Sequence, residues 1–497
     1  MRALLGFGDQ RPSLSAVSLL GAVSALMLAS LLHPSAAFFI VVPLALILPI
    51  MYAYEWFFAW RQQLAVLILV ILFIPIQRYA MAGGLPFQLE PYRILVALML
   101  AGWVMSLLID ERVTFRRSGF EEPIVLIAVA SLFSELANSQ RIATLDVQPE
   151  VIKGLMFLGS FFLIFYLVVS VVRTRADVER VLEVLCAGGG VLGIFAVIEY
   201  RTHYDAFDHL QRLMPFLTRL WPDGPGLSRG GDVRVIASAQ HPIALGALFV
   251  ILVPLSVYLA MRPGKRIWWV AAFAVMIGAL ASVSRTSIVM LAAVGLVFLW
   301  QRPRQTLKAW PLIVPAVLAI QLAVPGALRN VESSFFPQGG LVAQQSANGD
   351  QNRLSRWGPT LKEWRRDPLV GEGFSTRQPQ MHPETTVLDD QWLKSLVETG
   401  ILGVLGWLWL FGRSIGRLSR EAREDERGGW LELALAAGVT SFAVGMAFYD
   451  AFSFIQVTVI LFILLALDAS LGLARESESE ATARGASAAT VGSGESS

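Results

Sequence analysis

The sequence predicts an all-α membrane protein, a polytopic bundle of transmembrane helices. Of its residues, 55% are hydrophobic and only 16% are charged, and the mean hydropathy is +0.59. Apolar runs close to membrane-spanning length recur along the whole chain. Because a bilayer offers no water to satisfy backbone polar groups, these runs are expected to be helices. The single cysteine, Cys186, excludes a disulfide framework and a cysteine-rich metal site.

Hydropathy predicts about fourteen spans, with about twelve as the lower limit. The chain then divides into spans and their loops over 1–326, a large outer loop over 327–389, C-terminal spans over 390–473, and a tail over 474–497. The tail is small, polar and low in complexity, so it is expected to be disordered. The first run is interpreted as a retained span, because no small-residue cleavage site follows it. The predicted spans are 14–32, 36–54, 62–76, 93–109, 122–136, 153–172, 184–200, 240–261, 266–282, 284–300, 310–326, 390–412, 430–448 and 453–473.

Positive charges recur in alternate loops, which predicts the orientation of the bundle. With the N-terminus in the cytoplasm, every second loop carries arginine or lysine, and both termini are cytoplasmic. A short amphipathic helix over 174–185, with a capping box at Thr174 and Asp177, is expected on this inner surface, joined to the next span. Two long outer segments, 201–239 and 327–389, are also rich in arginine, and the orientation rule does not explain them. The inner positions are Arg2 and Arg11; Arg61; Arg112, Arg116 and Arg117; Arg173, Arg175 and Arg180; Arg262, Lys265 and Arg266; Arg302, Arg304 and Lys308; and Arg413 through Arg427.

Two candidate sites lie where predicted spans begin. In RVIASAQHPIALG, the pair His241-Pro242 is typical of a helix start. That explanation leaves open why Arg234 accompanies His241 at an outer boundary. In SVSRTS, Arg285 lies at the outer interface, where an arginine can simply extend its side chain to water. An ionisable group at this depth usually marks a functional path, and the neighbouring hydroxyls can bind phosphate, so function is favoured modestly.

Two further candidate sites belong to the polar stretch 352–403. Arg353 and Arg356 lie on the basic face of a predicted amphipathic helix, which Pro368 stops. A surface helix lying flat on anionic lipid explains that helix equally well. In DDQWLKSLVE, Asp389 is predicted as the N-cap. Asp390, Lys394 and Glu398 are spaced four apart, which permits ordinary ion pairs within a helix. Carboxylates beside a cationic loop are also suited to proton transfer.

Over residues 180–465 the chain resembles the O-antigen ligase and polysaccharide polymerase family of bacterial envelope membrane proteins. Each motif is weak, but their order and place in the topology make the resemblance fairly specific. Family ligases often have a histidine where this chain has Asp389 or Asp390. The form Asp-Asp-Gln-Trp-Leu is more similar to the polymerase branch. The matching motifs are Arg234 with His241-Pro242, Ser284-Arg285, Arg353-x-x-x-Trp357, Pro368-Leu369-x-Gly371-x-Gly373, and Leu393 followed by Glu398, Gly400, Leu402 and Gly403.

The resemblance implies a metal-independent glycosyltransferase without a cofactor, multi-pass in the bacterial inner membrane. Its donor would be an undecaprenyl-diphosphate-linked oligosaccharide, and an acceptor glycan would attack it on the outer side. Membrane lipids, a chain-length regulator and a flippase are the further partners implied, and nucleic acid is not. The expected diphosphate and glycan ligands are Arg285 and Arg353, then Arg234, Arg356 and His241. Asp389 or Asp390 is the expected base, and Glu398 is expected to orient the loop or to pair with an arginine.

Two alternatives stay open. A ligase would attach the same glycan to a lipid or protein acceptor instead of extending a polymer. A protein of another class, a small-anion transporter or a flippase for lipid-linked glycans, would use the arginines to line a path. The candidate charged residues all lie on the predicted outer side, and no chain of ionisable groups crosses the bilayer, which favours the enzyme.

Overall fold

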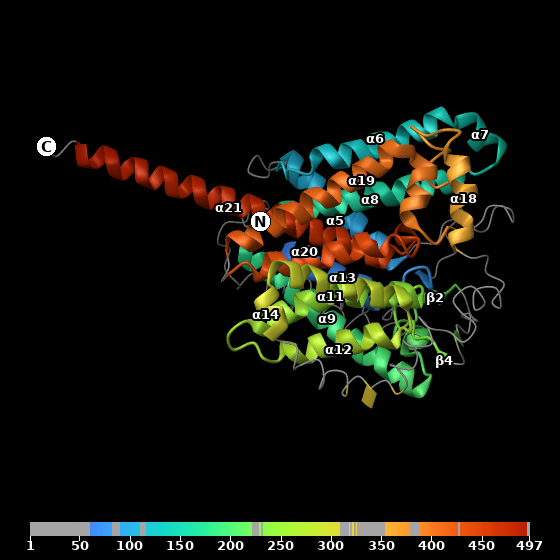
Figure 1. Cartoon of the computed structure of the whole chain (residues 1–497), viewed down its shortest axis with the longest axis horizontal. Helices are drawn as coiled ribbons and strands as arrows, with labels where there is room; N and C mark the ends of the chain where they lie inside the picture. The colour runs from blue at the N-terminus through green and yellow to red at the C-terminus, as the bar shows by residue number, and fades with distance from the viewer. Residues whose placement is uncertain are drawn as a thin grey trace, which may run out of the picture.

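The computed structural model describes residues 60–81, 90–109, 116–220, 228–229, 232–308, 353–377, 388–425 and 428–494, together with 318, 321–322 and 325. The predicted spans 14–32 and 36–54 lie outside these residues, as does almost all of 310–326. The described chain is a bundle whose long helices run side by side (Figure 1). This architecture agrees with the helical membrane protein that the sequence predicts, although the number of fourteen spans stays a prediction.

Within the described residues, five helices are long and apolar enough to cross a membrane. Five shorter apolar helices and α6 (Glu121–Ala137) pack among them. The long helices are α8 (Gln148–Val171), α9 (Arg175–Thr202), α11 (Pro242–Met261), α19 (Gln391–Glu424) and α21 (Ile455–Gly494). The shorter ones are α4 (Trp60–Phe73), α5 (Pro91–Ile109), α12 (Trp268–Ala281), α13 (Arg285–Gln301) and α20 (Trp430–Gly445).

Short elements gather at the two ends of the bundle. In Figure 1, α14 (Pro303–Lys308) lies at one end, and α7 (Ser139–Thr144) and α18 (Arg353–Trp364) lie at the other. The second end also carries two antiparallel strand pairs, together with η1 (Ala206–His209), α10 (Leu210–Leu213) and η3 (Ala451–Ser453). The strand pairs are β1 (Tyr79–Met81) with β2 (Leu217–Arg219), and β3 (Ser228–Arg229) with β4 (Asp232–Val233). We call this second end the site end.

The core lies around α11 and the first part of α21, whose apolar windows are 89% and 94% buried. The helices around them leave large apolar side chains on the outside, including Leu108 on α5 and Met156 on α8. A soluble protein rarely exposes such residues over a wide area, whereas a bilayer requires them. The chain is therefore a multi-pass membrane protein.

Ion pairs between helices hold together the end opposite the site end. We call it the arginine-rich end, because those of the predicted inner arginines that the structure describes lie there. They bind carboxylates on other helices, which links segments far apart in sequence. The prediction that these loops share one side agrees with this arrangement. The pairs are Arg61–Asp177 at 2.7 Å, Arg175–Glu432 at 2.9 Å, Arg262–Glu179 at 2.8 Å, Arg417–Asp468 at 2.7 Å and Arg475–Glu421 at 2.6 Å.

Two helices test the sequence prediction, and the structure differs from it in one of them. The surface helix over 174–185 is joined to the span over 184–200 as predicted, in one helix, α9, whose capping box at Thr174 and Asp177 is present. The tail from 474, predicted to be disordered, continues α21 as a helix to Gly494 that projects beyond the bundle (Figure 1). Its alanines and glutamates have high helix propensity, which accounts for the difference.

Candidate functional site

The starts of α11 and α13 lie against each other at the site end. His241 caps α11 as predicted, since its Nδ1 accepts a hydrogen bond of 3.2 Å from the Ile243 backbone N–H. Arg285 is the first residue of α13, and Ser284 is its N-cap. Gly246 allows the contact, because a Cβ there would lie 3.1 Å from the Cβ of Ser287 on α13, and even closer to its Oγ. The two predicted sites around His241 and Arg285 therefore form one corner of the molecule.

The connection between α20 and α21 joins this corner to the start of α19. The Phe454 ring stacks on His241 with the centroids 5.8 Å apart. On the other side, the Gln391 backbone N–H donates to the Met446 carbonyl at 2.7 Å, and Gln391 Oε1 accepts from the Phe452 N–H. Helices α11, α13 and α19 thus begin around one connection.

Asp390, and not Asp389, is the N-cap of α19. Its Oδ1 accepts a hydrogen bond of 3.0 Å from the Leu393 backbone N–H. The prediction was wrong by one residue, because both aspartates satisfy the local capping preference and only the packed chain decides where the helix starts. Asp389 is left half-buried just before the helix.

Lys394 also differs from its prediction. Its ammonium pairs at 2.8 Å with Asp450, in the connection between α20 and α21, a partner that the spacing along α19 does not indicate. Ser453 Oγ donates to the same carboxylate oxygen of Asp450 at 2.7 Å. The pair fastens the start of α19 to the connection that also contacts His241.

Helix α19 is interrupted at Gly400, and the outer-loop motif binds the interruption. Gly400 has φ 66° and ψ −166°, so the helix loses its regular hydrogen bonds there. The freed carbonyls of Val397 and Glu398 accept from the backbone N–H groups of residues 372 and 373 at 2.8 and 3.2 Å. The Ile401 N–H donates to the Pro368 carbonyl at 3.0 Å. The loop motif around Gly371 and the helix motif around Gly400 therefore satisfy each other's backbone hydrogen-bonding groups.

Glycine is needed on both sides of this junction. A Cβ at Gly400 would lie 2.6 Å from the Val370 backbone nitrogen, and one at Gly371 would lie 2.6 Å from the Glu398 carbonyl oxygen. Both residues also have positive φ, which L side chains rarely adopt. The spacing of glycines in the two motifs thus reflects a close approach between backbones.

A network of charges surrounds the junction. Arg141 on α7 binds Glu372 at 2.7 Å, and Arg377 forms an ion pair with Glu363 on α18. Burial raises the pKa of Glu372, and the hydrogen bond from Arg141 opposes that rise. Glu398 Oε1 accepts a 3.3 Å hydrogen bond from the Arg377 backbone N–H. Glu398 is buried and contacts the loop backbone through this hydrogen bond, while its predicted role stays a prediction.

Residues 270–408 match the family model Wzy_C, described as O-antigen ligase. The chain carries an O-antigen ligase domain. The match spans Arg285, α18, the Gly371 motif and the Gly400 interruption, so the recognition made from the motifs is confirmed. No curated protein sequence matches the chain significantly.

Arg234 and His241 precede the O-antigen ligase domain, and Arg234 is buried in the segment leading to α11. Glu199 holds this segment by accepting from the backbone N–H groups of Ile236 and Ala237 at 3.0 and 2.8 Å. Arg78 donates to the Ala237 carbonyl and pairs with Asp205 and Asp208. Burial raises the pKa of Asp205, against the opposing charge of Arg78.

The outer loop of the O-antigen ligase domain is described only in part. Arg353 begins α18, and the helix ends before Pro368 as predicted. The side chains of Arg353 and Arg356 lie outside the described residues, so their predicted roles stay predictions. Sequence reasoning missed Arg78 and Arg141, because their partners are distant in sequence; Arg141 and Glu372 are 231 positions apart. It also missed Arg377, which pairs with Glu363 on α18.

We expect Gly400→Ala to release the outer loop from α19. The φ and ψ of this residue are accessible essentially only to glycine, at a cost of ~1–3 kcal/mol for another residue, and the new methyl group would meet the loop backbone. Limited proteolysis should cut between residues 365 and 377 faster in this variant, while the protein stays in the membrane. Gly412→Ala on the same helix meets nothing within 4 Å and is the control. Equal protection of the loop in both variants would contradict the junction.

Proposed function

We propose that the protein is a membrane glycan polymerase. It transfers an undecaprenyl-diphosphate-linked oligosaccharide to an acceptor glycan on the outer side of the bacterial inner membrane, with both termini in the cytoplasm. The supporting observation is that α11, α13 and α19 begin around the α20–α21 connection, carrying His241, Arg285 and Asp389. A cation, hydrogen-bonding groups and a carboxylate then flank one membrane boundary.

The diphosphate would bind at the start of α13. The N-terminus of a helix favours anions, because its first N–H groups and its dipole both face the ligand. Arg285 adds a planar guanidinium, which binds two phosphate oxygens together. Arg353 at the start of α18 is the second proposed ligand, with Arg234, Arg356 and the His241 ring closer to the glycan.

The reaction forms one bond and breaks one bond. The oxygen of an acceptor hydroxyl attacks the anomeric carbon of the donor, and a new glycosidic C–O bond forms. The bond between that carbon and the diphosphate oxygen breaks, and its electron pair leaves with undecaprenyl diphosphate. Asp389 takes the hydroxyl proton, while the arginines stabilise the charge on the departing diphosphate.

The junction at Gly400 has a positioning role in this proposal. Glu398, Glu372 and Arg377 bind the loop after α18 to the interruption in α19. Because α18 carries Arg353, the junction would set the distance between the two proposed diphosphate ligands. The site would thereby be built from a rigid span and a docked loop.

A ligase is the second candidate, because the matching family model is described as O-antigen ligase. Ligase and polymerase share the donor, the leaving group and the proposed residues. They differ in the acceptor, which for a ligase is a separate lipid or protein.

The test is a reaction in vesicles that contain the purified full-length protein and a lipid-linked oligosaccharide repeat unit. A polymerase should yield a ladder of products from this donor alone, on a gel that resolves glycan length. A single addition that requires a separate lipid or protein acceptor would establish the ligase. Movement of the donor across the vesicle membrane without any new glycosidic bond would contradict both and favour the flippase.

A further inference from the structure

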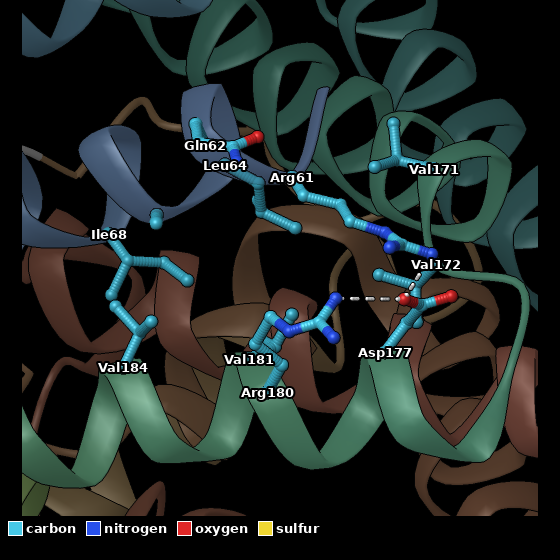
Figure 2. Close-up of a pocket in the computed structure, with 11 residues that line it drawn as sticks. Arg61, Gln62, Leu64, Ile68, Val171, Val172, Asp177, Arg180, Val181 and Val184 are labelled. Atoms are coloured by element: carbon cyan, nitrogen blue, oxygen red, sulfur yellow. Dashed lines mark hydrogen bonds and ion pairs between the residues drawn. The ribbon is translucent and has the colours of Figure 1, made fainter. Parts of the chain in front are cut away.

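A cavity lies at the arginine-rich end, far from the proposed catalytic residues. It has a volume of about 320 Å³ and opens between the start of α4, the end of α8 and the first turns of α9. Figure 2 shows Arg61 and Arg180 extending toward the carboxylate of Asp177, with the aliphatic side chains of Leu64, Ile68 and Val184 to one side. This volume is within the range of ordinary ligand pockets, roughly 300–1,000 Å³.

The mouth of the cavity carries more positive than negative charge. The Asp177 carboxylate lies 2.7 Å from the Arg61 guanidinium and 3.4 Å from that of Arg180. The same carboxylate also accepts from the backbone and the hydroxyl of Thr174 in the capping box. One carboxylate therefore serves two guanidinium groups, whose side chains are 56% and 54% exposed. Both arginines keep donors available for an anion.

The interior of the cavity is apolar except for one amide. Leu64 and Ile68 on α4 face Val181 and Val184 on α9 across it. Gln62 lines the same cavity, and its buried Oε1 accepts no hydrogen bond from any residue that the structure describes. An occupant with an anionic group, a hydroxyl and an aliphatic part would complement all three features.

We propose that this cavity binds an acidic glycerophospholipid, with its phosphate between Arg61 and Arg180. The aliphatic wall receives the first methylene groups of an acyl chain, and Gln62 accepts from a headgroup hydroxyl. Basic pockets between membrane helices at the cytoplasmic side are suited to such headgroups. The proposal does not depend on the reaction at the site end. It assigns a structural lipid to the contact between α4 and α9.

Native mass spectrometry of the full-length protein with equal amounts of phosphatidylglycerol and phosphatidylcholine tests this. The wild-type protein should retain phosphatidylglycerol in preference. Arg61→Gln combined with Arg180→Gln should lower that retention about tenfold or more, because two charge-assisted hydrogen bonds are lost. Ala65→Trp should lower it too, since it fills the cavity and leaves the charges in place. Arg304→Gln combined with Arg420→Gln, two exposed arginines of the same end, is the matched control.

Each outcome decides the proposal. Wild-type retention in the double arginine variant, or equal loss in the control, would overturn it. If phosphate at millimolar concentration displaces the lipid and Ala65→Trp has no effect, the cavity binds a free anion and not a lipid. If the double variant fails to fold, Arg180→Gln alone keeps the Arg61–Asp177 pair and should still retain severalfold less phosphatidylglycerol; unchanged retention there would also refute the proposal.

Discussion

Arg285→Ala is expected to abolish polymer formation while the protein remains in the membrane. Arg285 begins α13, where the helix dipole and the backbone N–H groups already favour an anion. Removing one preorganised donor from a developing negative charge typically costs ~10²–10³-fold in rate. Lysine should restore little activity, because its ammonium lacks the planar fork that binds two phosphate oxygens. Arg353→Ala is expected to have the same effect if both arginines hold the diphosphate.

Polymer length on a gel, together with the amount of lipid-linked repeat unit that accumulates, measures this effect. Arg304→Ala is the control, because Arg304 is an exposed arginine on α14 at the opposite end. Normal polymer from Arg285→Ala and Arg353→Ala would leave both arginines as interfacial anchors. Loss of the protein from the membrane would instead mean that Arg285 stabilises the corner between α11 and α13. In that case, the activity per molecule of Arg285→Lys would decide whether Arg285 also binds the diphosphate.

Asp389→Asn is expected to stop glycan transfer without loss of expression. Asparagine keeps the shape of the side chain but cannot take the proton of the acceptor hydroxyl. Loss of a general base typically costs ~10²–10⁴-fold in rate. Asp390→Asn is the matched control, because Asp390 caps α19 and asparagine caps a helix about as well as aspartate. The two neighbouring substitutions therefore separate proton transfer from helix capping.

The measurement is the rate of polymer formation by equal amounts of each purified variant. A large loss in Asp390→Asn with normal activity in Asp389→Asn would exchange the two assignments. Normal rates in both variants would remove the aspartates from the mechanism. Glu398, which faces the loop backbone, and His382, which lies outside the described residues, would then be the next bases to test.

Local signals in the sequence were sufficient for several elements. The capping box at Thr174, the helix start at His241-Pro242 and the end of α18 before Pro368 are all present in the structure. Each depends on residues within about one helical turn, so the order of amino acids alone encodes it. The apolar runs likewise predicted the described long helices, because a bilayer admits few other structures.

The sequence by itself determined the helical membrane class, the O-antigen ligase resemblance and the segments that carry Arg285, Arg353 and Asp389. The tertiary structure decided which residues meet. It paired Lys394 with Asp450, Arg141 with Glu372, and the Gly371 motif with the interruption at Gly400. These contacts join elements far apart along the chain, and many carboxylates are available to each cation. Only the packing of the helices brings one of them within hydrogen-bonding distance, so no local pattern could have identified it.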